Sequence, residues 1–132
     1  MRVTKRFTFS ASHRLFNRSM ADDDNKSLFG QCNRPHGHNF VLEVTVEGPV
    51  DPKTGMVINF QDLKHIVNKN VVEYFDHQDF ENDIPEFADK VQTVENLARI
   101  VWDRLADKFP FGPRLAKIKI CETSDNWVEL GE

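Results

Sequence analysis

The most regular pattern in this chain is the alternation of apolar and polar residues in segments 3–11 and 38–47. Such alternation places successive side chains on opposite faces of an extended backbone, so each segment predicts a strand with one buried face. The pattern returns in segment 115–122, and segment 127–130 predicts a short final strand. We therefore expect four strands, of which the first carries His13 at its far end.

Two intervening segments have the periodicity of amphipathic helices instead. Apolar residues recur at intervals of three and four in segments 63–75 and 94–105. Thr93 is a suitable N-cap for the second helix, and Pro110 ends helical structure after it. The polar segment 17–31 has no period and predicts a mobile flap.

The order of these elements predicts one α+β domain over residues 1–132. Two apolar helix stripes need a common surface to cover, so we expect a four-stranded antiparallel sheet with both helices on one face. A chain of 132 residues is long enough to bury roughly two thirds of its unfolded surface and to fold without disulfides.

Charge and composition exclude several classes of protein. The 17 basic and 21 acidic residues give a net charge of -4 and are interspersed, so no basic stripe for nucleic acid is present. No segment approaches the roughly 20 apolar residues of a membrane span, and the first residues alternate and form no apolar leader. We therefore expect a cytoplasmic protein without nucleic-acid or membrane partners, with its cysteines as thiols.

Three of the five histidines suggest a metal site. His36 and His38 are two residues apart and share one face of the second strand, while His13 ends the first strand. Three imidazoles from neighbouring strands suit a zinc ion with one open coordination position, although imidazole also binds iron, nickel and copper. The alternative is a set of solvated or internally hydrogen-bonded imidazoles.

Cys32 stands four residues before His36 in a polar segment. A cation bound nearby would favour its thiolate form, so the placement predicts a base or a nucleophile. Two alternatives stay open from the spacing. The thiol fills a gap in the packing, or it is a fourth ligand that closes a structural zinc site.

Two acidic positions also suggest chemistry. Asp76 and His77 follow the apolar end of the first helix, so the pair either shuttles protons or caps the helix. Glu122 continues the apolar face of its strand, where an unpaired carboxylate is costly. A carboxylate there suits a ligand with two adjacent N–H donors, such as the amino-pyrimidinone edge of guanine or pterin, unless it simply faces water at the strand end.

Several separated motifs follow one another along nearly the whole chain. They are segment 7–15, Cys32, His36-Gly37-His38, segments 55–57 and 62–64, Asp76-His77, segment 93–96, Glu122-Thr123 and Gly131-Glu132. In this order they resemble the 6-pyruvoyltetrahydropterin synthase and 6-carboxytetrahydropterin synthase family. The resemblance implies the tunnelling fold, in which sheets of several subunits close into a barrel, commonly as a hexamer of two trimers with active sites between subunits.

The resemblance also implies a substrate, 7,8-dihydroneopterin triphosphate, and roles for individual residues. The implied zinc ligands are His13, His36 and His38. The implied catalytic residues are Cys32, Asp76 and His77, and the pterin would be bound by Glu122 and Thr93.

Two products are open within such a family. Three residues separate Cys32 from His36, and this compact spacing resembles that of the 6-carboxytetrahydropterin synthases, which release acetaldehyde and triphosphate in queuosine biosynthesis. This is our main prediction. The alternative is a 6-pyruvoyltetrahydropterin synthase that eliminates triphosphate, of which segment 56–59 is typical. A third possibility is a pterin-binding module without chemistry. Arg14, Arg18 and Lys26 could contact the triphosphate, but nothing in the sequence fixes them there, so we interpret them as solvated surface.

Overall fold

Two strands of twelve residues form the centre of the sheet. In the computed structural model, which describes residues 1–109 and 112–132, β1 (Arg2–His13) and β2 (His36–Glu47) pair antiparallel along their whole length. β4 (Arg114–Cys121) pairs antiparallel with the other edge of β2, and β5 (Trp127–Gly131) pairs with β4. The predicted helix stop at Pro110 lies outside the described residues.

The sheet has five strands and not the four that the alternation predicts, with the order β3-β1-β2-β4-β5. The additional strand, β3 (Gln78–Asp79), has two residues and pairs parallel with β1, so the sheet is mixed and not purely antiparallel. Alternation cannot be recognised in two residues, which is why the sequence gives no signal for it. α4 (Phe80–Asp83) and the 3₁₀ turn η3 (Pro85–Phe87) follow it.

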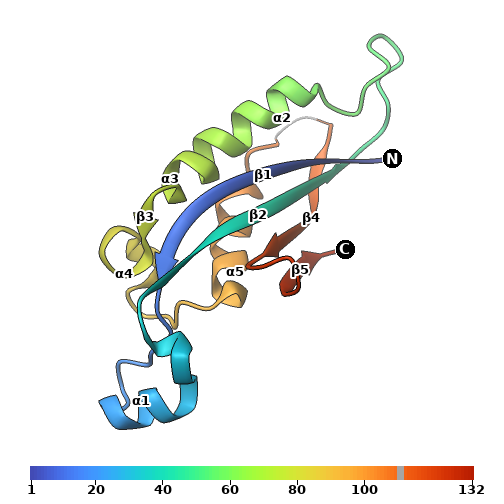
Figure 1. Ribbon diagram of the computed structural model, residues 1–132. Helices are drawn as coiled ribbons and strands as arrows, with labels where there is room; N and C mark the ends of the chain where they lie inside the picture. Colours follow the sequence, from blue (N-terminus) through green and yellow to red (C-terminus); the bar gives the residue numbers. More distant parts are fainter. Residues whose placement is uncertain (110–111) are drawn as a thin grey trace.

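The helices that the periodicity predicts lie together on one face of the sheet (Figure 1). The side chain of Thr93 accepts a hydrogen bond from the backbone N–H of Asn96, so the predicted N-cap is confirmed. The first predicted helix contains a π-helical turn that the sequence does not predict. The helical elements on this face are α2 (Phe60–Val67), the π turn η2 (Asn68–Val72), α3 (Glu73–Phe75) and α5 (Val94–Leu105).

Segment 17–31, which the sequence predicts as a mobile flap without regular structure, is partly helical. The segment contains α1 (Asp22–Phe29), followed by the 3₁₀ turn η1 (Gly30–Asn33). All three residues that open α1 are aspartates, which the helix dipole favours at this end. Asn25 is buried and donates from Nδ2 to the carbonyl oxygen of Asn17 at 3.0 Å, which ties the helix to the preceding loop.

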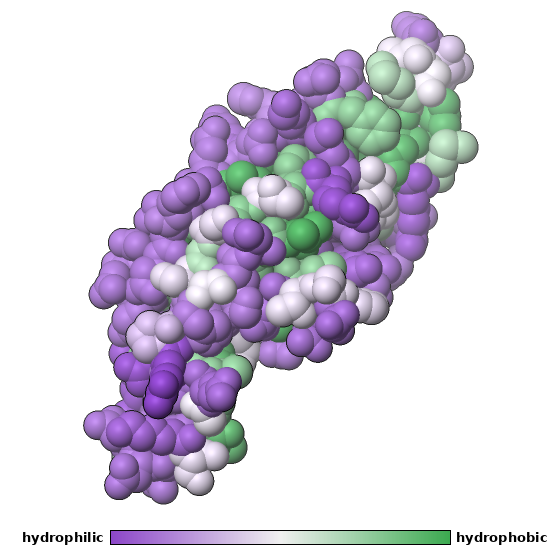
Figure 2. Space-filling view, in the orientation of Figure 1, coloured by the Kyte–Doolittle hydropathy of each residue, from purple (hydrophilic) through white to green (hydrophobic). Residues whose placement is uncertain are grey.

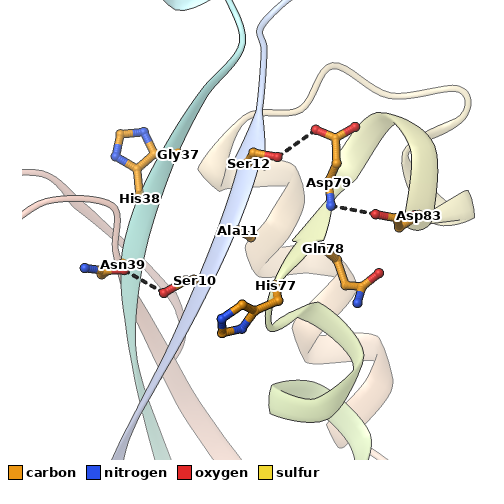
Figure 3. A pocket seen from close by; sticks show the side chains of 10 residues that line it. All are labelled: Ser10, Ala11, Ser12, Gly37, His38, Asn39, His77, Gln78, Asp79 and Asp83. Carbon is orange, nitrogen blue, oxygen red and sulfur yellow. Dashed lines mark hydrogen bonds between the residues drawn. The ribbon is translucent and has the colours of Figure 1, made fainter.

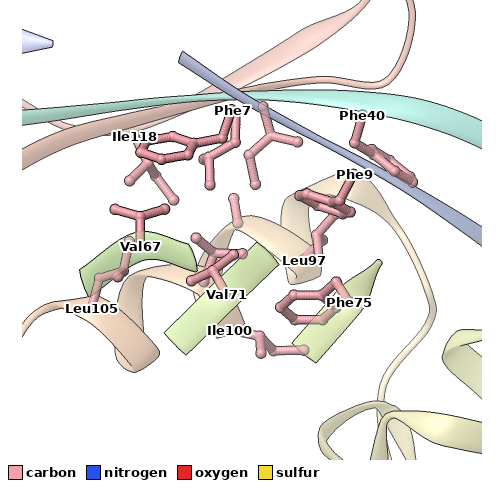
Figure 4. Close-up of a cluster of buried hydrophobic side chains, with 14 of the residues drawn as sticks. Phe7, Phe9, Phe40, Val67, Val71, Phe75, Leu97, Ile100, Leu105 and Ile118 are labelled. Atoms are coloured by element: carbon pink, nitrogen blue, oxygen red, sulfur yellow. The ribbon is translucent and has the colours of Figure 1, made fainter. Parts of the chain in front are cut away.

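A hydrophobic cluster that combines aliphatic side chains with several phenylalanines fills the space between the sheet and the helices (Figure 4). The ring centroid of Phe9 lies 5.3 Å from that of Phe40 and 5.6 Å from that of Phe75. Phe40 also contacts the imidazoles of His38 and His13, with centroid separations of 5.5 Å and 6.0 Å. Core packing therefore fixes the strand ends that carry the histidines.

No helix of the described residues covers the other face of the sheet (Figure 1). Figure 2 shows a mostly hydrophilic surface with apolar residues along the middle of this face and at the end that carries the loop 48–59. Val50, Met56 and Phe60 are 40%, 39% and 50% exposed there. Of the helices in the described part of the chain, none is both long enough and apolar enough to span a membrane.

Candidate active site

Two adjacent strand ends bring three imidazoles together. His13 is the last residue of β1 and pairs with His36, the first residue of β2, while His38 follows two residues later. Their ring centroids lie between 4.5 Å and 5.2 Å apart. Glu122, directly after β4, adds a carboxylate, and one ligand atom from each of the four residues lies within 4.8 Å of the others.

Backbone carbonyl groups hold two of these rings through Nδ1. The Nδ1 of His13 lies 2.7 Å from the carbonyl oxygen of Gln92, and the Nδ1 of His36 lies 2.7 Å from that of Arg34. A ring that donates from Nδ1 to a carbonyl keeps its Nε2 free to bind a metal. The Nε2 atoms of His13 and His38 are buried and have no hydrogen-bond partner. Three imidazoles with a carboxylate therefore fit a divalent ion such as zinc.

Burial lowers the pKa of both His13 and His38. Desolvation is the largest cause for each. The hydrogen bond with Gln92 opposes it at His13, the charge of Glu122 opposes it at His38, and His36 adds to the lowering at both. A lowered pKa keeps these imidazoles neutral near pH 7, which is the form that binds a metal.

The carboxylate of Glu122 faces the imidazole cluster. Its Oε1 lies 2.9 Å from the Nε2 of His38 and 3.9 Å from the Nε2 of His13, and its side chain is 23% exposed. The short contact with His38 lacks the angle of a hydrogen bond, since that nitrogen has no hydrogen-bond partner. The sequence predicts a partner for the Glu122 carboxylate, and the histidine cluster is that partner. The other carboxylate oxygen can accept a hydrogen bond from a ligand.

Glu122 also lines a hollow of about 560 Å³. Cys32 and Thr93 lie on its wall, together with Leu15 and Trp127. Apolar and polar side chains share this wall, and a hollow of this volume is typical of a small-molecule site. The structure therefore brings together, around one space, three residues that the resemblance assigns to catalysis and pterin binding.

Cys32 is exposed and lies outside the cluster of candidate metal ligands. Its backbone carbonyl accepts a hydrogen bond from the N–H of Leu15 at 2.8 Å, which ties η1 to the segment that follows β1. This arrangement disfavours the closed structural zinc site, because that site requires the sulfur among the ligand atoms.

Asp76 and His77 form a second candidate pair at the end of α3. Asp76 accepts a hydrogen bond from the backbone N–H of Ser10 at 2.8 Å, and its other oxygen lies 2.8 Å from the Nδ1 of His77. The bond from Ser10, followed by that from His77, holds the pKa of Asp76 below its usual value. His77 has a φ of 60°, which is uncommon for a residue with a Cβ and is typical of functional sites. Its exposed imidazole is therefore oriented by an ionised carboxylate.

His77 and Cys32 do not share a hollow within one described chain. His77 lines a hollow of about 500 Å³ with Ser10, and neither Cys32 nor Glu122 belongs to its wall. Figure 3 shows His77 beside β1, whereas the imidazole of His38 projects from the far side of β2. One chain therefore does not bring the predicted catalytic residues into contact.

Gln92 and Arg34 contact candidate metal ligands, and the sequence does not reveal either contact. Each acts on a candidate metal ligand through its backbone carbonyl, which any residue type would supply. The side chain of Gln92 is also hydrogen-bonded at both ends of its amide, since its oxygen accepts from the backbone N–H of Arg14 and its nitrogen donates to Glu81. A polar residue in an aperiodic segment is normally interpreted as exposed, so only the fold reveals that Gln92 is buried.

An α+β fold with a mixed sheet, and with a histidine cluster beside a ligand-sized hollow, defines a class of candidate metal-dependent enzymes that act on small molecules. The sequence model described as 6-pyruvoyl tetrahydropterin synthase matches residues 2–132. The chain belongs to this family, so the resemblance drawn from the motifs is confirmed.

Similar proteins carry two names. The chain is 46% identical over 128 residues to 6-pyruvoyl tetrahydrobiopterin synthase of Homo sapiens, which covers 96% of this chain and 88% of that one. It is 37% identical over 100 residues to an Archaeoglobus fulgidus protein provisionally named 6-carboxy-5,6,7,8-tetrahydropterin synthase, covering 76% and 78%. The solved structure of Caenorhabditis elegans 6-pyruvoyl tetrahydropterin synthase superposes with a TM-score of 0.92 at 34% identity, over 100% of this chain and 95% of that chain.

Proposed function

We propose that this protein is a zinc-dependent 6-pyruvoyltetrahydropterin synthase that eliminates triphosphate from 7,8-dihydroneopterin triphosphate. The observation that carries the proposal is the position of the histidine cluster and Glu122 beside a hollow lined by Cys32 and Thr93. Membership of the family supports it. The 6-pyruvoyl product was the alternative in our prediction, and it takes first place because the human relative carries that name.

The metal and the pterin would bind side by side. His13, His36 and His38 would hold the zinc ion, which when bound acts as a Lewis acid toward the oxygens of the substrate side chain. Glu122 can accept two N–H groups from the amino-pyrimidinone edge of the pterin, and Thr93 offers a hydroxyl on the same wall.

Proton transfer is assigned to Cys32 and to the Asp76–His77 pair. Cys32 removes a proton from a side-chain carbon, and His77, held by Asp76, moves a proton on the other side of the substrate. Each transfer contributes about 10²-fold or more to the rate. The C–O bond to triphosphate breaks, and the electrons that leave the side chain reduce the pterin ring within the same molecule, so no external reductant is needed.

The active site is proposed to form between subunits, because one chain places His77 and Cys32 in separate hollows. Association through the exposed edge of β5 would close the sheets into the barrel of the tunnelling fold, commonly a hexamer of two trimers. The exposed apolar side chains of Met56, Phe60 and Trp127 support such contacts.

Product analysis tests the proposal. Zinc-loaded protein is incubated with 7,8-dihydroneopterin triphosphate under reducing, anaerobic conditions, with the Cys32→Ala variant as the control. We expect 6-pyruvoyl-tetrahydropterin and triphosphate from the intact protein and neither from the variant. If the intact protein binds the pterin but forms no product, a binding module replaces the enzyme.

The second candidate is 6-carboxytetrahydropterin synthase. The three-residue spacing between Cys32 and His36 and the Archaeoglobus fulgidus relative favour it. Acetaldehyde together with 6-carboxytetrahydropterin in the same assay would establish this activity in place of the first.

A further inference from the structure

A hollow apart from the one assigned to the pterin is lined by positive charge. It measures about 290 Å³ and lies between α1 and the segments that follow β1 and precede β2. With three cations and one carboxylate, its wall has an excess of two positive charges. The residues on this wall are Arg14, Lys26, Arg34, Asn33, Pro35 and the carboxylate Asp22.

These three cations have no acidic partner among the described residues. Arg14, Lys26 and Arg34 take part in none of the ion pairs found there. By contrast, Arg104 and Arg114 each lie within 3.0 Å of a carboxylate. The Nε of Arg14 is buried and has no hydrogen-bond partner, an unfavourable state that a bound anion would relieve.

The guanidinium of Arg14 is held in place by an aromatic ring. Its Cζ lies 4.3 Å from the ring centroid of Phe16, and the Cζ of Arg18 lies 4.9 Å from the same centroid. Stacking fixes the plane of a guanidinium and leaves its N–H edge free for a ligand. Asn33, which is 8% exposed, donates from Nδ2 to the carbonyl oxygen of Leu15 at 3.0 Å and so fixes the adjoining wall.

The segments that carry these cations also carry the histidine cluster. Arg14 directly follows His13, and the carbonyl oxygen of Arg34 accepts from the Nδ1 of His36. The hollow and the proposed zinc site are therefore built from the same two segments of the chain. One elongated substrate could therefore occupy both places.

We propose that Arg14, Lys26 and Arg34 form a phosphate-binding subsite that holds the triphosphate chain of the substrate. The proposal rests on the proposed function for the identity of the anion, and on the hollow for the existence of a site. Arginine binds phosphate through paired N–H groups and lysine binds it as a point charge. Cations at this position also stabilise the charge that develops on the leaving triphosphate. Arg14 and Lys26 are then substrate ligands and not solvated surface.

Direct binding of inorganic triphosphate tests the subsite. The full-length protein is used without metal, because triphosphate chelates zinc, and binding is measured by calorimetry at low ionic strength. We expect Lys26→Ala and Arg34→Ala each to weaken binding about tenfold. The matched control is Lys64→Ala, an equal charge change at an exposed position of α2, which we expect to alter binding by less than about twofold. Absence of binding by the unmodified protein, or equal weakening by the control, would overturn the subsite.

Two further measurements separate the subsite from the proposed reaction. Asp22→Asn removes the one carboxylate on the wall, so it should tighten triphosphate binding, and weaker binding would contradict the assignment. In steady-state assays we expect Lys26→Ala to raise the KM for the triphosphate substrate. If triphosphate binds as described but no product forms, the subsite stands and the proposed function fails. If product forms with an unchanged KM in both alanine variants, the function stands and the subsite fails.

Discussion

The Nδ1 of His13 lies 2.7 Å from the backbone carbonyl oxygen of Gln92, and the side chain of Gln92 is itself fixed at both ends. Its Oε1 accepts from the N–H of Arg14 at 3.1 Å, and its Nε2 donates to Glu81 at 2.8 Å. Glu81 in turn pairs with Arg18 at 2.9 Å. The loop before α5 thus sets the direction of one candidate metal ligand from outside the sheet.

Replacing this glutamine should weaken metal binding although it is not a ligand. Gln92→Leu keeps the volume but removes both side-chain hydrogen bonds, so the carbonyl that orients His13 loses its support. We expect the zinc affinity to fall about tenfold or more, measured by competition with a chromophoric chelator and by the absorption spectrum of the cobalt-substituted protein. Gln61→Leu, at an exposed position of α2, is the matched control. An unchanged affinity would show that the Gln92 side chain does not position His13.

Removing the metal should abolish turnover while leaving the fold. The buried core lies between the sheet and the helices and is complete without an ion, unlike that of a small zinc-stabilised domain. We expect a chelator to lower the thermal midpoint only by the loss of ligand binding, which corresponds to about 2.7 kcal/mol when free zinc is a hundredfold above its dissociation constant. Circular dichroism with and without the chelator measures this. Complete unfolding on chelation would indicate a structural site.

We expect the Asp76–His77 pair to affect turnover without affecting metal binding, because neither residue belongs to the cluster of candidate metal ligands. His77→Asn is the suitable change, since asparagine tolerates the left-handed backbone at this position. We expect kcat to fall about 10²-fold to 10⁴-fold with zinc affinity unchanged, and His65→Ala on α2 to leave both unchanged.

Mixed oligomers provide the decisive control for that variant. If the site is shared between subunits, unfolding and refolding Cys32→Ala together with His77→Asn should restore part of the activity, because some interfaces then receive both intact residues. Mixtures that stay inactive, although they contain both chains, would place the two residues in one subunit or remove His77 from the reaction.

The strands and helices that pack on the core were predictable, and the short or polar elements were not. The apolar residues of segments 3–11 and 38–47 alternate because one face of each strand is buried. This alternation therefore predicts β1 and β2. β3 has two residues, and α1 is stabilised by its acidic first turn and by Asn25, not by an apolar stripe. Hydrophobic periodicity carries no information about such elements.

The candidate site was predictable where one strand supplies its residues. His36 and His38 share a face by their spacing alone, and the pairing of β1 with β2 brings His13 beside them. Contacts made by backbone carbonyls, such as that of Gln92, leave no trace in residue type. The separation of His77 from Cys32 depends on the relative placement of distant elements, which a linear pattern does not encode.

A half-buried polar network joins the π turn to α5. Tyr74 donates its hydroxyl hydrogen bond to Glu86, and the guanidinium of Arg104 lies 3.0 Å from the other oxygen of Glu86. The Cζ of Arg104 lies 3.6 Å from the ring centroid of Tyr74, and its Nε donates to the carbonyl of Asn70 within the π turn at 2.7 Å. Burial, with the hydrogen bond and charge of Glu86, raises the pKa of Tyr74 to about 12. Burial also raises the pKa of Glu86, but the hydrogen bonds from Tyr74 and Arg104 outweigh it and leave that pKa below its usual value.

This network should make stability depend on pH at both extremes. A tyrosine pKa raised from 10.0 to about 12 contributes stability that is complete below pH 10 and is lost as the pH rises toward 12. The lowered pKa of Glu86 contributes stability that is present above its ordinary value of 4.5 and is lost as the pH falls below it. We expect Tyr74→Phe to cost about 1–3 kcal/mol at neutral pH. In urea titrations the difference from the unmodified protein should shrink between pH 10 and 12, because ionised Tyr74 no longer donates to the carboxylate, and a constant difference over that range would contradict the assignment.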